Sequence, residues 1–229
     1  DSDLYRAHPD WMLGPRDQTT GRGQMVLNLA LPEVRENLFQ QVSAVLAEYP
    51  IDYIKWDHNR LLPVVDAAQT RGVYDLIDRL RLAHPGVEIE SCASGGGRID
   101  AGILSRTHRV WLSDSNDALE RLRMQADAAL FLPSCITGSH VGPRHCHTSG
   151  RVLPMAFRAW VAAQRHMGFE MPLHARGHPR WVLHRHQPAG DLGVGLGGNH
   201  RLLPGPLIPA PPPVHFERGP CPLPFERGV

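Results

Sequence analysis

Lysine is almost absent from this chain of 229 residues, and long apolar runs are absent altogether. One lysine, Lys55, stands among 24 cationic residues, and the others are arginine. No apolar run approaches the ~20 residues that a membrane-spanning helix requires, and no signal-peptide pattern opens the sequence. The net charge is +1, so no basic field favours nucleic acid or an anionic membrane. These absences predict a globular, cytoplasmic protein that binds neither nucleic acid nor membranes.

Cysteine is also scarce, with four residues scattered along the chain and none in a C-x-x-C pair. Neither a disulfide framework nor a zinc site is indicated. His140, His145 and His147 lie close in sequence, but apart from Cys146 no acidic or thiol ligand pattern accompanies them. We therefore expect neither a metal ion nor a cofactor.

The single lysine stands out against so many arginines. Arginine presents a planar fork of five donors, whereas lysine presents a compact ammonium with three. Lys55 is therefore expected where a fork does not fit, or it has survived by chance, and the sequence leaves both alternatives open.

The chain divides into two regions of different composition. Residues 1–171 hold most of the acidic residues and show periodic segments, whereas residues 172–229 are rich in Pro, Gly and His. A packed helix or a central strand is hard to build from so many prolines. We predict that residues 172–229 form an irregular or disordered tail. A frame-shifted stretch and a natural Pro-rich tail are the two alternatives for its origin.

Residues 1–171 alternate between strand-like and helix-like periods. Helices are predicted from Pro32 onward and at 74–82, 117–132 and 152–167. Strands are predicted at 24–30, 52–57, 87–93, 110–114, 135–140 and 168–171. This alternation indicates a parallel sheet with right-handed crossovers, which both a doubly wound sheet and a TIM barrel satisfy.

Polar residues at the ends of the predicted strands favour the barrel. Asp57, Cys92, Asp114 and His140 each fall at the carboxyl end of a strand. In a TIM barrel these ends converge on one mouth where catalytic groups collect, whereas an open sheet spreads them along an edge. The predicted fold is therefore an α/β barrel of the TIM type.

Asp57 and Asp114 are the candidate catalytic residues. Two carboxylates on different strands at one mouth are what glycosidic cleavage needs, one as nucleophile or base and the other as acid. Each has a structural alternative as a helix cap or turn residue, and this alternative is stronger for Asp114, which lies among cap-forming residues at 113–117.

The three glycines at 95–97 fit a plain turn, a phosphate cradle or a close approach of backbone to a sugar. They lack the flanking residues of nucleotide-binding loops.

Several motifs together resemble one enzyme family. The string YIKWDHNR at 53–60 resembles the nucleophile motif of the family-36 glycoside hydrolases, the microbial α-galactosidases. Further segments resemble that family in the same order, namely SDLYRAHPDWML at 2–13, ESCASGGGRID at 90–100, WLSDSNDALERL at 111–122, and GSHVGP with the later TSGR and HMGFEM. The resemblance spans essentially all of residues 1–171 and implies a catalytic TIM barrel. In the family the nucleophile follows the fourth strand and the acid/base follows the sixth.

The resemblance implies a role for each matching residue. Asp57 is the implied nucleophile and Asp114 the implied acid/base, while Asp117 begins a helix. The implied substrate-binding residues are Arg22, Lys55, Trp56, Asn59, Cys92, Gly95 and Trp111. Lys55 is also expected to keep Asp57 ionised, because an ammonium nearby favours the charged carboxylate.

The implied reaction is the retaining hydrolysis of terminal α-galactosides of the melibiose or raffinose type. It passes through a covalent β-galactosyl enzyme in a double displacement. The implied partner is a galactose-containing oligosaccharide, and full-length members of the family often form homo-oligomers.

The chain is several times shorter than the family's chains. In the family a segment like that at 2–13 follows the second barrel strand, so the six predicted strands look like the third to the eighth. The resemblance thus implies an incomplete barrel, and residues 172–229 match nothing in the family. We expect the chain by itself to hydrolyse α-galactosides poorly or not at all, as an inactive remnant or a galactoside-binding fragment.

Overall fold

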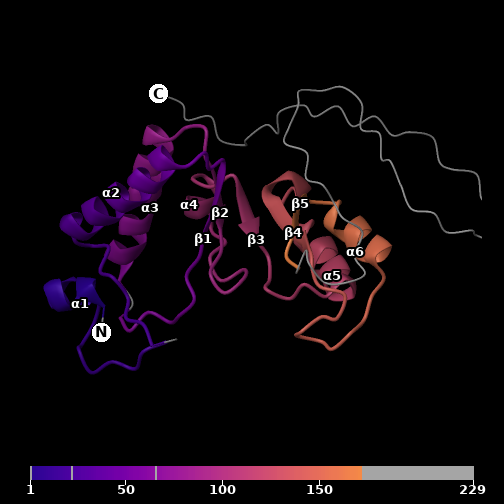
Figure 1. The fold of residues 1–229 in the computed structure, drawn as a ribbon, viewed down its shortest axis with the longest axis horizontal. Coiled ribbons are helices and arrows are strands. Elements are labelled where there is room, and N and C mark those ends of the chain that lie inside the picture. Colours follow the sequence, from indigo (N-terminus) through magenta and orange to yellow (C-terminus); the bar gives the residue numbers. More distant parts are fainter. Residues whose placement is uncertain (1, 22, 65, 172–229) are drawn as a thin grey trace, which may run out of the picture. The chain divides into compact units, whose positions relative to one another are not determined.

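Five parallel strands run through the part of the chain that the computed structural model describes, which is residues 2–21, 23–64 and 66–171 (Figure 1). The strands are β1 (Tyr53–Trp56), β2 (Glu88–Ser91), β3 (Arg109–Trp111), β4 (Thr137–Val141) and β5 (His166–Phe169). Each pairs with the next in chain order, so the sheet order is β1-β2-β3-β4-β5. A doubly wound sheet reverses its order at a switch point, and these strands do not. The predicted α/β class is confirmed, and the sheet is consistent with part of a TIM-type barrel.

Helices alternate with the strands. They are α1 (Asp3–Ala7), α2 (Pro32–Glu48), α3 (Ala67–Ala83), α4 (Ala101–Leu104), α5 (Ala118–Ala128) and α6 (Met155–Ala162), with short 3-10 turns η1 (Pro9–Trp11) and η2 (Ser134–Ile136). Local chemistry sets their starts. Pro32 opens α2, where its fixed φ suits the first turn and its missing N–H costs nothing. Asp66 and Asp100 accept backbone N–H groups at the starts of α3 and α4.

The predicted strand at 24–30 is wrong. The segment makes only isolated bridges, Met12 with Leu27 and Gly21 with Gln24. The side-chain amide of Gln69 takes up two of its backbone groups, because it accepts from Leu29 N (2.7 Å) and donates to Leu27 O (3.0 Å). The segment is therefore extended and partly buried without joining the sheet.

Several predicted boundaries also shift. Helix α3 begins seven residues before the predicted 74, and α6 ends at Ala162 rather than 167. The residues after α6 enter β5 at His166, whereas the strand was expected from 168. The β5 register explains this, because Gly138 pairs with His166 and His140 with Gly168.

One cluster of the hydrophobic core lies between the strands and the helices. Ile77 of α3, Ile89 of β2 and Ile103 of α4 are at most 1% exposed and form one cluster. Ile54 and Trp56 of β1 pack against it. Side chains alternate across a strand, so Lys55 lies on the other face of β1. The odd-numbered residues of β1 are thereby directed to the face that carries the candidate site.

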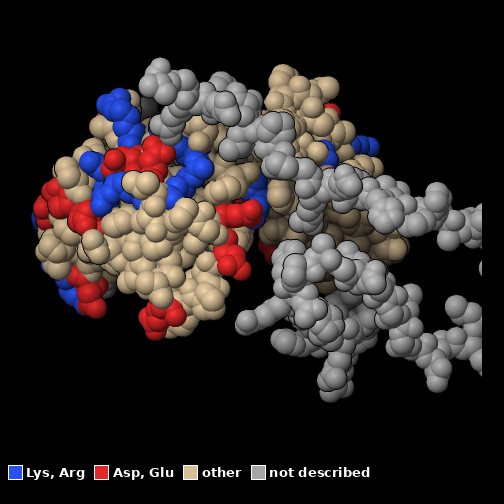
Figure 2. Space-filling model, turned by 90° about the horizontal axis from the view of Figure 1, so that it is seen from above, with Lys and Arg blue, Asp and Glu red and all other residues tan. Residues whose placement is uncertain are grey.

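Ion pairs join α2 and α3 on the outside. Arg35 Nε lies 2.9 Å from Asp75 Oδ2, and Arg79 Nη2 lies 2.5 Å from Glu36 Oε2. In Figure 2, basic and acidic side chains likewise lie next to one another on the face in view. Exposed pairs of this kind contribute at most about 1 kcal/mol each. None of the helices among the described residues has the length and apolar character to cross a membrane.

Candidate active site

Three of the four predicted polar strand ends lie at carboxyl ends of the sheet. Asp57 directly follows β1, Cys92 directly follows β2, and Asp114 comes three residues after β3. His140 lies inside β4 and not at its end. Its Nδ1 is 3.0 Å from Glu170 Oε2, and its ring lies 4.3 Å from that of Trp111.

Four donors surround the Asp57 carboxylate. Its oxygens accept from the backbone N–H of His58 (2.8 Å) and from the Asn59 amide (2.5 Å). Partial burial raises the pKa of Asp57, but these bonds and those from the Cys92 thiol and the Ser94 backbone N–H outweigh burial. The pKa of Asp57 therefore lies below its ordinary value, and the side chain stays ionised. The residue is also exposed to solvent.

The source of this stabilisation differs from the expected one. The ammonium of Lys55 lies 3.9 Å from Glu90 Oε1 and 4.0 Å above the ring of Trp111. The groups that lower the pKa of Asp57 are neutral hydrogen-bond donors. Lys55, which was expected to keep Asp57 ionised, is not among these donors.

Cys92 is a buried neutral donor to the nucleophile candidate. Burial and the hydrogen bond to Asp57 raise the pKa of the thiol to about 12. The thiol therefore keeps its proton and donates a hydrogen bond to the carboxylate. The backbone of Cys92 joins the same strand ends, because its N–H donates to Trp56 O (2.9 Å) and its carbonyl accepts from His58 N (3.2 Å).

Asp114 is exposed and is oriented by Trp111. The indole Nε1 donates to Asp114 Oδ1 at 3.0 Å. Trp111 itself is 1% exposed, and the ammonium of Lys55 and the guanidinium of Arg121 each lie 4.0 Å from a centre of its ring system. A rigid buried indole thus presents the Asp114 carboxyl to the solvent side of the strand ends.

Asp117, and not Asp114, caps the following helix. Asp117 Oδ1 accepts from Leu119 N (2.9 Å), and Oδ2 binds the Ser149 hydroxyl and the Arg151 guanidinium. Its side chain is fully buried, and these donors outweigh burial to hold the pKa of Asp117 below its ordinary value. The capping alternative for Asp114 is thereby removed.

We expect Asp117→Asn to lower the free energy of unfolding by about 1.5–3 kcal/mol at neutral pH, since a buried charge-assisted network is lost. Asp66→Asn is the matched control, because Asp66 caps α3 from an exposed position and Asn caps equally well. The pKa of Asp117 is lowered by folding, so its stabilisation is present above the ordinary Asp pKa and disappears as pH falls through the folded value. Urea unfolding of both variants at neutral and acid pH measures this, and equal losses in the two would contradict it.

The glycine loop packs against the Asp114 backbone. Gly95 has φ +85°, and a Cβ there would lie 2.9 Å from Ser113 Cα and 3.2 Å from Asp114 N. Glycine here allows the loop to approach the backbone of the acid/base candidate, which differs from the approach to a sugar considered from sequence. The same loop gives the Ser94 N–H to Asp57. The two carboxylates are therefore linked through one loop.

Replacing Gly95 with Ala is expected to destabilise the fold by about 1–3 kcal/mol and to reduce turnover, because the backbone at Asp114 must shift. Gly150→Ala separates the two causes. Gly150 has φ +69° with nothing within 4 Å of a new Cβ, so it carries the conformational cost without the crowding. Thermal unfolding and turnover of both variants check this prediction, and equal activity in the two would refute it.

Other predicted substrate-binding residues lie in different surroundings. Asn59 and Cys92 contact the carboxylate of Asp57. Trp111 contacts that of Asp114, and Lys55 lies over the ring of Trp111. Trp56 packs against the hydrophobic core on the opposite face of β1. Arg22, like residues 172–229, lies outside the described residues.

Sequence reasoning gave no role to Arg98, which joins β1 to β2. Its guanidinium donates to Trp56 O (2.8 Å), Cys92 O (2.9 Å) and the Ser91 hydroxyl (3.1 Å). The carbonyls are those just before Asp57 and at Cys92, so Arg98 fixes the spacing of the two strand ends. The position of Arg98 directly after the three glycines was the feature of the sequence that could have pointed to this role.

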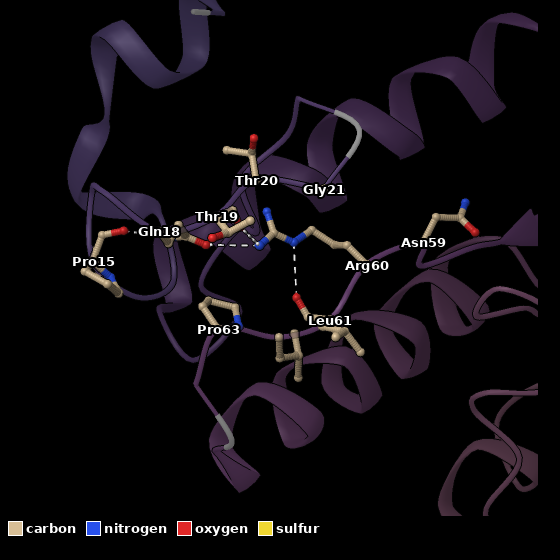
Figure 3. A pocket seen from close by; sticks show the side chains of 10 residues that line it. Pro15, Gln18, Thr19, Thr20, Gly21, Asn59, Arg60, Leu61 and Pro63 are labelled. Carbon is tan, nitrogen blue, oxygen red and sulfur yellow. Dashed lines mark hydrogen bonds between the residues drawn. The ribbon is translucent and has the colours of Figure 1, made fainter.

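A cavity of about 480 Å³ adjoins the nucleophile loop (Figure 3). The cavity is lined by Pro15 and by residues 18–21 and 59–63, and Asn59 belongs to both the cavity and the Asp57 site. Arg60 spans the cavity, donating to Gln18 Oε1 (3.2 Å), Thr19 O (3.1 Å) and Leu61 O (3.1 Å). The polar groups here are thus engaged in holding one loop to the other.

Among the described residues, no group of three or more His, Cys, Asp or Glu side chains is placed to hold a metal ion.

Comparison with known proteins identifies the family. The family model described as Melibiase matches residues 1–178. An α-galactosidase of Escherichia coli is 48% identical over 180 residues, which are 75% of this chain and 25% of that protein. Probable α-galactosidase G of Emericella nidulans is 44% identical over 168 residues, covering 70% of this chain and 23% of that protein.

Solved structures agree with the sequence relatives. The GH36 α-galactosidase AgaA from Geobacillus stearothermophilus matches with a TM-score of 0.69 at 35% identity, over 75% of this chain and 26% of that one. The chain therefore spans about a quarter of the length of these relatives. The predicted resemblance to family-36 α-galactosidases is confirmed, and the chain belongs to the Melibiase family.

Proposed function

We propose that this protein acts as an α-galactosidase that cleaves terminal α-galactosides with retention of configuration. The observation that carries the proposal is the pair of exposed carboxylates, Asp57 and Asp114, linked through the loop that follows β2. The named relatives are α-galactosidases, which supports the same activity for the protein to which this chain belongs. Variants of the Geobacillus enzyme were solved in complex with raffinose and with stachyose. This supports galactose-containing oligosaccharides as the substrate class.

The surroundings of the two carboxylates divide the chemistry between them. Asp57, held ionised by its four donors, attacks the anomeric carbon as the bond to the leaving oxygen breaks. Asp114 serves as the acid and gives a proton to that oxygen. A water molecule then attacks the anomeric carbon, gives a proton to Asp114 and releases both Asp57 and α-galactose.

We assign the sugar contacts to the side chains near the pair. Lys55, Asn59, Cys92 and Trp111 supply an ammonium, an amide, a thiol and an indole within one group of contacts. Arg22 stays a proposed ligand on the strength of the motif alone. Gly95 serves by allowing the loop to approach Asp114, and Trp56 is left out because it packs in the core.

In barrel terms, β1 to β5 correspond to the fourth to the eighth strands. Asp57 then follows the fourth strand and Asp114 the sixth, as in the family pattern. Residues 1–171 contribute the catalytic part of the barrel under this proposal.

Proton NMR of p-nitrophenyl α-galactoside incubated with stoichiometric protein tests the proposal. We expect α-galactose to appear before its β anomer. If β-galactose forms first, the mechanism is inverting and Asp57 is not a nucleophile. Equal cleavage of the α-glucoside would refute the sugar preference, and binding of galactose without cleavage would favour a galactoside-binding fragment instead.

A further inference from the structure

Glu90 is a buried carboxylate that the mechanism does not use. Lys55, Glu90 and Arg109 are direct neighbours in the registers of β1, β2 and β3, so their side chains share one face of the sheet. The Glu90 side chain is 2% exposed, and its Oε2 lies 3.3 Å from Arg109 Nε. Its Oε1 lies 3.9 Å from Lys55 Nζ. One carboxylate thus stands between two cations from the adjacent strands.

The two cations depend on Glu90 to different degrees. Arg109 has a second acid, because its Nη2 donates to Glu88 Oε2 at 2.6 Å. The Glu90 Oε1 atom that faces Lys55 accepts no hydrogen bond from the described residues. A buried acceptor left in this state costs free energy, so its retention calls for an explanation beyond stability. The Lys55 ammonium lies at ion-pair distance from this atom. Glu90 also interacts with the Tyr53 hydroxyl and with Arg121, and Lys55 also attracts the carboxylate of Glu170 at longer range.

The sheet leaves room for this carboxylate. A Cβ at Gly138 of β4 would lie 2.7 Å from Glu90 Oε2 and 3.2 Å from Trp111 Cε3. Glycine at this position lets Glu90 and Trp111 lie side by side beneath Lys55. The ammonium lies 4.0 Å above the Trp111 ring, and the indole N–H of that ring holds Asp114.

We propose that Glu90 is a positioning residue that holds the Lys55 ammonium against the face of Trp111. It thereby fixes the cation offered to a sugar hydroxyl and the indole that orients Asp114. The sugar part rests on the proposed function, whereas the placement of Lys55 does not. A compact ammonium suits this narrow place between a carboxylate and a ring face, which accounts for lysine where the chain otherwise uses arginine.

The single lysine makes the placement directly measurable. Protein labelled with ¹³C-lysine gives one lysine spin system, from Lys55. Protons held over an indole face resonate upfield of those in free lysine, so the Lys55 Hε shift reports its distance from Trp111. We expect a clear upfield shift in the unaltered protein and its loss, toward the free-lysine value, in Glu90→Gln.

Glu88→Gln is the matched control. Glu88 lies on the same strand and the same face as Glu90, and its carboxylate also pairs with Arg109. Among the described residues it makes no ion pair with Lys55. We expect the Lys55 shift to stay in place. An unchanged shift in folded Glu90→Gln, or an equal change in Glu88→Gln, would overturn the proposal.

Glu90→Asp guards against a Gln variant that fails to fold. It keeps the charge for Arg109 and draws the carboxylate back from Lys55 by one methylene, so we expect a partial loss of the upfield shift. An unchanged Lys55 shift in Glu90→Asp refutes the proposal.

Calorimetry then measures galactose binding, which we expect Glu90→Gln to weaken roughly tenfold. If the unaltered protein binds no galactose, the proposed function fails while the Lys55 shift still decides the role of Glu90.

Discussion

A galactose-configured cyclitol epoxide is expected to label this protein once, on Asp57, and to leave Asp57→Asn unlabelled. The reason is that the epoxide carbon takes the place of the anomeric carbon, and only an ionised carboxylate in line with it opens the ring. Asp57 is held in that state by donors from Cys92, Asn59 and two backbone N–H groups. Peptide mapping by mass spectrometry locates the label. The reaction needs binding and one attack, so it detects the nucleophile even where turnover is slow.

Turnover of p-nitrophenyl α-galactoside is expected to fall about 10³-fold or more in the same variant, because an amide cannot form the glycosyl ester. Asp52→Asn is the control, since Asp52 is an exposed aspartate at the other end of β1. It should react with the epoxide and turn over substrate like the unaltered protein. A label on Asp114, or undiminished labelling of Asp57→Asn, would remove Asp57 from the role of nucleophile.

Elements with a strong period were predictable from the sequence, and the one predicted strand that is absent, at 24–30, fails because of contacts with residues distant in the chain. Each of the strands β1 to β4 contains at least one β-branched or aromatic residue, and all four lie where they were expected to within a few residues. The segment at 24–30 has the same alternation. Its backbone groups are taken by Gln69, forty residues away, and by residues 11–13. Alternation predicts an extended backbone but does not tell what the backbone pairs with.

The candidate site divides in the same way. Asp57, Cys92 and Asp114 were predictable as strand-end residues because their places depend on local chain direction alone. The partners of those residues depend on register between strands, which a single sequence does not determine. Lys55 was expected to act on Asp57, but cross-strand pairing brings it to Glu90 and Trp111. Arg98 and Glu90 were missed for this reason.

Asp114→Asn is expected to separate substrates by their leaving groups. An asparagine cannot protonate the glycosidic oxygen, so hydrolysis of raffinose should fall about 10²–10⁴-fold. Cleavage of 2,4-dinitrophenyl α-galactoside should form the glycosyl enzyme at nearly the normal rate, because dinitrophenolate leaves without a proton. Deglycosylation still lacks its base, so a burst of dinitrophenolate should precede a slow steady state.

The burst distinguishes the two acids that follow β3. Asp117→Asn disturbs the start of α5 and a buried network, so it should lower both activities in proportion to the protein that remains folded. Asp114, exposed and held by a single indole N–H, should alone show the dependence on leaving group. Azide attacks without a general base, so it should restore the second step in Asp114→Asn. It displaces the β-linked ester from the opposite face, and the expected product is therefore α-galactosyl azide. Equal losses for raffinose and the dinitrophenyl substrate would show that Asp114 does not transfer the proton.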